Sequence, residues 1–165
     1  GAGQPEFPAN QQQAVLALPL TGVATAVDIG DAKEGHFSNK KEVGSRLAGL
    51  ALNDLYEKKS LCRSPQYAAH KIVGDKIIIT LEHADGLRSR TPEIKGFAIR
   101  AENGPWLWAD DVRLNGSTVE VRAHAIKTPA AVRYGWAINP ILSLENKNRL
   151  PLRPFRTDRE EGALR

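Results

Sequence analysis

Apolar residues recur at every second position in several short runs beyond residue 76, and this alternation restricts the possible folds more than any other feature of the chain. In the first run Ile77, Ile79 and Leu81 alternate with other side chains, and the period recurs in residues 97–100, 106–108, 119–122 and 132–136. Alternate side chains of a strand point to opposite faces of its sheet. Turn-forming pairs separate the runs, and Asn115-Gly116 is a strong signal for a two-residue hairpin. We therefore predict an antiparallel β-sandwich over residues 66–158, followed by a tail at 159–165.

The first 58 residues show a different pattern. Residues 23–29 are short, mostly apolar and partly β-branched, which predicts a strand buried on both faces of a parallel sheet. A polar loop follows, and Asn39 with Glu42 three residues later fits a capping box. Apolar residues then recur at helical spacing, with charged residues predicted on the surface. The apolar positions are Val43, Leu47, Leu50, Ala51 and Leu55, and the surface positions are Lys40, Arg46 and Asp54.

Composition excludes several classes of protein. The 165 residues include 41% hydrophobic and 25% charged residues, as in an ordinary globular protein. The net charge of +4 is not gathered into a basic run, so we predict no nucleic-acid partner. No apolar stretch approaches the roughly 20 residues that span a bilayer. Cys62 is the only cysteine, so neither an internal disulfide nor a metal site built from cysteines is possible.

His36 is the residue in the amino-terminal part that is best placed for chemistry. It lies in the predicted loop between a strand end and a helix start, and in open α/β sheets ligands bind beyond such strand ends. A neutral imidazole there can take a proton from a hydroxyl group, and Asp31 and Glu34 are near enough in sequence to orient it. The alternative interpretation is a loop histidine that only touches solvent. Asp28 and Asp31 could form an acid–base pair, or they could end the strand and bind loop amides.

The other candidate groups favour structural roles. His70, His83 and His124 share no metal-ligand spacing, so no metal or cofactor is predicted. Three tryptophans, Trp106, Trp108 and Trp136, could form a platform for a sugar, but positions 106 and 108 also suit a sandwich core, which we predict. The chain has no GxSxG elbow, and no serine in a glycine-flanked turn near His36. The residues therefore supply a base without a nucleophile.

Several motifs in order resemble one family. TGVATAVDIGDAKEGHFSNKKEVGSRLAGLAL, KGFAIRAENGPWLWADDVRLNGSTVEV, AVRYGWAINP and PFRTD resemble sequences of the sialate O-acetylesterases, which belong to the SGNH-type esterases. The resemblance runs from about residue 14 to residue 158 and covers only the carboxyl-terminal portion of the family's length. It identifies His36 with the catalytic histidine. Lys33 stands where many SGNH enzymes have an aspartate, so the resemblance implies a Ser–His dyad oriented by Asp31 or by a backbone carbonyl.

The resemblance also implies a fold and a function. Residues 1–58 would be the last strand and helix of an SGNH, flavodoxin-like α/β domain, and the β-sandwich would follow it. The function would be hydrolysis of O-acetyl esters of sialic acid or related sugars. A companion chain or segment would carry the serine and the oxyanion hole, so the isolated chain is predicted to be inactive. The setting would be extracytoplasmic: periplasmic, secreted or lysosomal. The alternative is a non-catalytic β-sandwich that binds carbohydrate or protein.

Overall fold

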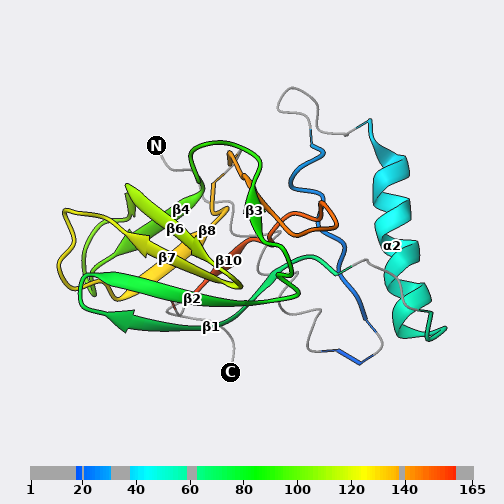
Figure 1. Cartoon of the computed structure of the whole chain (residues 1–165), viewed down its shortest axis with the longest axis horizontal. Helices are drawn as coiled ribbons and strands as arrows, with labels where there is room; N and C mark the ends of the chain where they lie inside the picture. Colours follow the sequence, from blue (N-terminus) through cyan, green and yellow to red (C-terminus); the bar gives the residue numbers. More distant parts are fainter. Residues whose placement is uncertain (1–17, 20, 31–37, 59–62, 138–139, 159–165) are drawn as a thin grey trace.

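A computed structural model describes residues 18–19, 21–30, 38–58, 63–137 and 140–158. Within them a single helix precedes strands that pair only antiparallel (Figure 1). The elements are α2 (Lys40–Asp54), β1 (Gln66–Val73), β2 (Lys76–Glu82), β3 (Arg88–Ser89), β4 (Phe97–Arg100), β5 (Leu107–Trp108), β6 (Asp111–Asn115), β7 (Thr118–Arg122), β8 (Ala131–Tyr134), β9 (Leu144–Glu145) and β10 (Phe155–Arg156).

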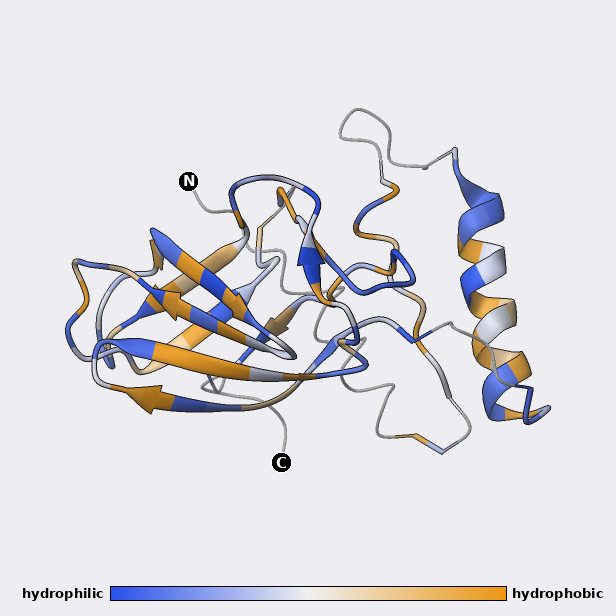
Figure 2. Cartoon of the chain, viewed as in Figure 1, coloured by the Kyte–Doolittle hydropathy of each residue, from blue (hydrophilic) through white to orange (hydrophobic). Residues whose placement is uncertain are grey.

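Two four-stranded sheets share one apolar core. Their strand orders are β1-β2-β7-β6 and β10-β8-β4-β5, and β3 pairs with β9 in a third, two-stranded sheet. From the first sheet Ile77 pairs with Val121 in register, and both are fully buried. From the second, the rings of Phe97 and Tyr134 meet with centroids 4.5 Å apart. The alternation seen in the sequence is visible along the strands in Figure 2, and the antiparallel β-part of the predicted fold agrees with this arrangement.

The hairpin predicted at Asn115-Gly116 is confirmed. It joins β6 to β7, with Asn115 opposite Thr118, and Gly116 has a φ of +60°. Glycine adopts this left-handed conformation without steric cost, which is why such a turn favours it at this position.

The α/β part of the predicted fold class is wrong. Residues 23–29 form no strand, and every sheet in the described residues is antiparallel. The segment runs beside α2 and ends in a turn, in which the Ile29 amide donates to the Ala26 carbonyl at 3.2 Å. A parallel strand needs neighbours to bind its backbone groups, and the described residues supply none for this segment. The described part of residues 1–58 therefore shows no SGNH, flavodoxin-like fragment.

Helix α2 forms where predicted, but its buried face differs from the predicted one. Arg46, placed on the surface by the sequence pattern, is only 6% exposed, whereas Leu47 and Leu55 are 48% and 55% exposed. Among the described residues, α2 lies beside the extended segment 21–30, which Arg46 contacts at Thr25 and Asp28, and only Arg46 and Gly49 of the helix are buried. Figure 2 shows apolar colour on several faces of the helix.

The buried side chain of Asn146 forms hydrogen bonds to backbone groups of separate chain segments beside β9. Its amide nitrogen donates to the carbonyls of Arg63 at 3.0 Å and His83 at 3.1 Å. Its oxygen accepts from the amides of Asn148 and Leu150, each at 3.1 Å. All the hydrogen-bonding groups of this amide are thereby used, so burying it carries no desolvation penalty that is left uncompensated.

Among the described residues, no helix is long and apolar enough to cross a bilayer. The predicted boundary between residues 58 and 66 stays a prediction, although β1 begins at Gln66. The tail predicted at 159–165 lies outside the described residues.

Candidate functional site

The predicted site residues His36 and Asp31 lie in segment 31–37, outside the described residues. Their roles therefore stay predictions. Both ends of the segment are described, however. Gly30 precedes it, two residues after Asp28, and Ser38 follows it, immediately before the helix cap Asn39.

A buried ion pair holds the first end of segment 31–37. The two guanidinium Nη atoms of Arg46 donate to the two carboxylate oxygens of Asp28 at 2.7 and 2.8 Å. Arg46 also donates to the Thr25 carbonyl at 2.6 Å and to the Glu42 carboxylate at 3.0 Å. The side chains of Arg46 and Asp28 are only 6% and 7% exposed. Hydrogen bonding to Asp28 is the largest influence on the pKa of Arg46, which is raised.

The structure gives Asp28 a role that neither interpretation from the sequence named, which is an ion pair with Arg46. Both of its carboxylate oxygens are engaged by one guanidinium in the bidentate arrangement that is strong and directional. Its role is to fix the backbone that leads into segment 31–37. Sequence reasoning missed Arg46, because the partner lies 18 residues away. A usable signal was Glu42 four residues before it, which is the spacing of a helical ion pair.

The helix cap holds the second end. The Asn39 side-chain oxygen accepts from the Glu42 amide at 3.2 Å, which confirms the predicted N-cap. The amino-terminal end of α2 carries the positive end of the helix dipole. That end follows Ser38 directly, so it is three residues from the predicted base His36.

The remaining histidines have structural surroundings. The Tyr67 hydroxyl lies 2.7 Å from Nδ1 of His70, and the His124 ring pairs with the Asp110 carboxylate. His83 contributes its carbonyl to the Asn146 amide. No group of three His, Cys, Asp or Glu residues in the described part of the chain is placed to hold a metal ion.

The tryptophans do not form the core, and the prediction that they do is wrong. Two arginines form cation–π contacts with the Trp106 ring. The guanidinium carbon of Arg133 lies 4.1 Å from the ring centroid, and that of Arg100 lies 5.0 Å from it. Trp136 lies near Arg133 and Arg156 in the same way. These side chains occupy the outer face of the sheet β10-β8-β4-β5, because Arg133 pairs with Ala98 and the core residue Phe97 pairs with Tyr134.

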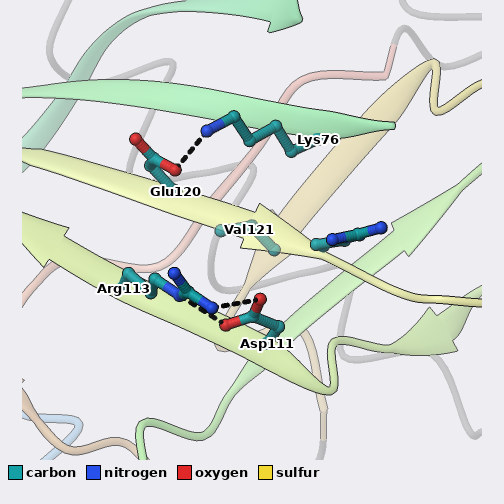
Figure 3. A pocket seen from close by; sticks show the side chains of 6 residues that line it. Lys76, Asp111, Arg113, Glu120 and Val121 are labelled. Atoms are coloured by element: carbon teal, nitrogen blue, oxygen red, sulfur yellow. Dashed lines mark hydrogen bonds and ion pairs between the residues drawn. The ribbon is translucent and has the colours of Figure 1, made fainter. Parts of the chain in front are cut away.

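A small hollow on the other four-stranded sheet is filled with paired charges. Figure 3 shows Lys76 pointing to Glu120 and Arg113 pointing to Asp111, with nitrogen–oxygen distances of 2.5 and 3.0 Å. The hollow measures about 90 Å³. The Lys76–Glu120 pair joins the neighbouring strands β2 and β7, and the Arg113–Asp111 pair lies within β6. These charges neutralise one another, so the hollow offers little to a ligand.

The described structure is similar to the crystal structure of a carbohydrate acetylesterase from Xanthomonas citri. The two chains are 35% identical, with a TM-score of 0.85. The fold is thus related to that of an esterase. The match covers 90% of this chain and 35% of the other, so this chain spans about a third of that enzyme's length. The neighbour supports a relation to carbohydrate acetylesterases in general, without singling out the sialate enzymes. No protein-family model matches the sequence, and no curated protein matches it.

Proposed function

We propose that this chain is part of a serine esterase that removes O-acetyl groups from sialic acid or a related acetylated sugar. The observation that carries the proposal is the structural similarity to a carbohydrate acetylesterase over nine-tenths of this chain. The sequence motifs around His36 and the two anchored ends of segment 31–37 support it further. The serine would come from polypeptide outside these 165 residues.

In the proposed reaction His36 takes the proton of the serine hydroxyl as the serine oxygen attacks the acetyl carbonyl. The bond between the acetyl carbon and the sugar oxygen then breaks, and His36 returns the proton to that oxygen. A water molecule, activated by the same imidazole, releases acetate from the serine. Asp31 would orient the ring. Backbone donors for the oxyanion, each worth about 3 kcal/mol in the transition state, would belong to the missing polypeptide.

Segment 31–37 is suited to this role because α2 anchors it at both ends. The Asp28–Arg46 pair fixes the backbone before the segment, and Asn39 caps the helix after it. A catalytic base must keep its geometry within about 0.5 Å, which a segment attached to one rigid element can achieve.

The test uses the protein isolated from its native source with any polypeptide that copurifies. We expect hydrolysis of an O-acetylated sugar by the native sample, none by the pure 165-residue chain, and fluorophosphonate labelling of a serine on the other polypeptide. His36→Ala should lower kcat by a factor of about 100 to 10,000. His124→Ala, which alters an exposed histidine on the β-sandwich, is the matched control and should leave kcat unchanged. Turnover by the pure chain, or full activity of His36→Ala in the native sample, would contradict the proposal.

A further inference from the structure

A hollow of about 430 Å³ opens at one end of the sheet β10-β8-β4-β5. Two of the residues at its edge are large and exposed: Trp108 is 63% exposed and Ile141 is 67% exposed. The lining is mostly apolar and consists of Ile94, Lys95, Gly96, Phe97, Trp108, Ala109, Ala137, Pro140 and Ile141. Its volume falls within the range of about 300–1,000 Å³ that small-molecule sites occupy.

Trp108 differs from the other two tryptophans. Trp106 and Trp136 each have arginine guanidiniums over their rings, whereas no such contact in the described residues involves Trp108. Its cross-strand partner is Ala98, which pairs in turn with Arg133, so the three form a row on the outer face of the sheet. Ala98 contributes only a methyl group to this row. The indole therefore has a small cross-strand neighbour and also lines the hollow.

A polar rim accompanies the apolar lining. The ammonium group of Lys95 lies 3.0 Å from the Glu93 carboxylate, and the two side chains are 55% and 76% exposed. Lys95 is one of the residues that line the hollow, so its ammonium group offers a hydrogen-bond donor there, and the paired Glu93 carboxylate offers an acceptor next to it. A pyranose ring has the complementary chemistry, because it presents apolar C–H groups on its faces and hydroxyl groups around its edge.

We infer that this hollow binds one O-acetylated pyranose ring of a glycan. The ring would stack on the Trp108 indole, its hydroxyls would meet Lys95 and Glu93, and the acetyl methyl group would enter the apolar lining. A protein partner fits less well, since a stable interface buries about 800 Å² on each side and this feature is a confined concavity. The choice of an acetylated sugar rests on the proposed function.

The test is a titration of the ¹⁵N-labelled chain with methyl 6-O-acetyl-α-D-glucopyranoside, followed by NMR. Trp108→Phe identifies the indole N–H signal of Trp108 by its loss. We expect this signal to move on titration while that of Trp136 stays in place, and the parent glucoside without the acetyl group should bind more weakly. Trp108→Ala should weaken binding about tenfold or more, as for aromatic anchors of other binding sites.

The matched control is Ile72→Ala, which removes an exposed apolar side chain from β1 in the other sheet and should leave binding unchanged. Dispersed amide signals in each variant show that it is folded. No movement of the Trp108 signal at millimolar sugar, or equal binding by Trp108→Ala, would overturn the inference. Because the titration needs no catalysis, its failure is distinguishable from the failure of the proposed esterase activity.

Discussion

Replacing Asp158 by asparagine tests how the arginine cluster on the outer sheet face stabilises the protein. Asp158 is 4% exposed and binds two guanidiniums at once. One carboxylate oxygen accepts from Nε of Arg133 and Nε of Arg156, each at 3.1 Å. The other accepts from Nη2 of Arg133 at 2.6 Å and Nη2 of Arg156 at 2.7 Å. The carboxylate thus joins the end of β10 to β8 and offsets the repulsion between the two arginines.

The size of the effect follows from the pKa of Asp158. Burial alone would raise this pKa, but the hydrogen bonds to Arg133 and Arg156 outweigh burial and lower it from 3.8 to about 2. Each pKa unit corresponds to about 1.4 kcal/mol, so the ionised carboxylate contributes about 2 kcal/mol to the free energy of unfolding. Because the folded-state pKa is the lower one, this contribution is complete above the unfolded-state pKa near 4. It is lost as the pH falls towards 2, and about half of it is gone by pH 3.

Urea unfolding of the wild type and of Asp158→Asn, measured at several pH values, gives the test. The variant should be less stable at pH 7, and the difference between the two free energies should shrink by about 1 kcal/mol from pH 5 to pH 3. Asp85→Asn is the matched control, since the pair of Asp85 with Lys147 is exposed and should contribute less than about 1 kcal/mol. A difference that stays constant from pH 7 to pH 3 would refute the reasoning.

Two further predictions concern stability: one tests backbone strain and close packing at a glycine, and the other tests buried hydrogen bonds. Gly96→Ala should destabilise the protein by about 2–4 kcal/mol in thermal unfolding, because φ is +97° and an added Cβ would lie 2.6 Å from Cδ2 of Leu142. The control Gly44→Ala, with open space around the added Cβ, should show no loss of stability. Equal stability of the two variants would argue against strain at Gly96. Asn146→Ala should cost about 2–4 kcal/mol in urea unfolding, because it leaves buried backbone groups unpaired. Asn103→Ala, on an exposed turn, should change stability by less than about 0.5 kcal/mol, and a similarly small effect at Asn146 would contradict the proposed role of its amide.

The sequence predicted the inner strands of the sandwich well because each of them buries one face. The runs around Ile77, Phe97, Val119 and Val132 all contain strands of the structure. Strand β1 was not among the predicted runs. Most of its residues are exposed or only half-buried on both faces, so burial imposed no apolar alternation on its sequence.

The errors share one physical origin, which is pairing between residues distant in the sequence. Arg46 was predicted on the surface because the local sequence pattern contains no information about its partner Asp28. Trp106 was predicted in the core because no neighbouring residue indicated that Arg133 from β8 covers its ring. Residues 23–29 have the composition of a buried strand, but a strand also requires partners, which composition cannot specify. Segment 31–37 with His36 stays at the level of prediction.

The correction of the fold changes how the proposed catalytic base is held. In an α/β domain a parallel strand and its neighbours would fix the backbone before His36. Here α2 does so through Arg46, seven residues after the cap at Asn39. Both anchors of segment 31–37 therefore lie on one helix, and the entropy cost of closing so short a segment is small. In the proposed enzyme, the backbone on both sides of the His36 segment would thus be fixed within this chain, and the polypeptide proposed to supply the serine would dock against it.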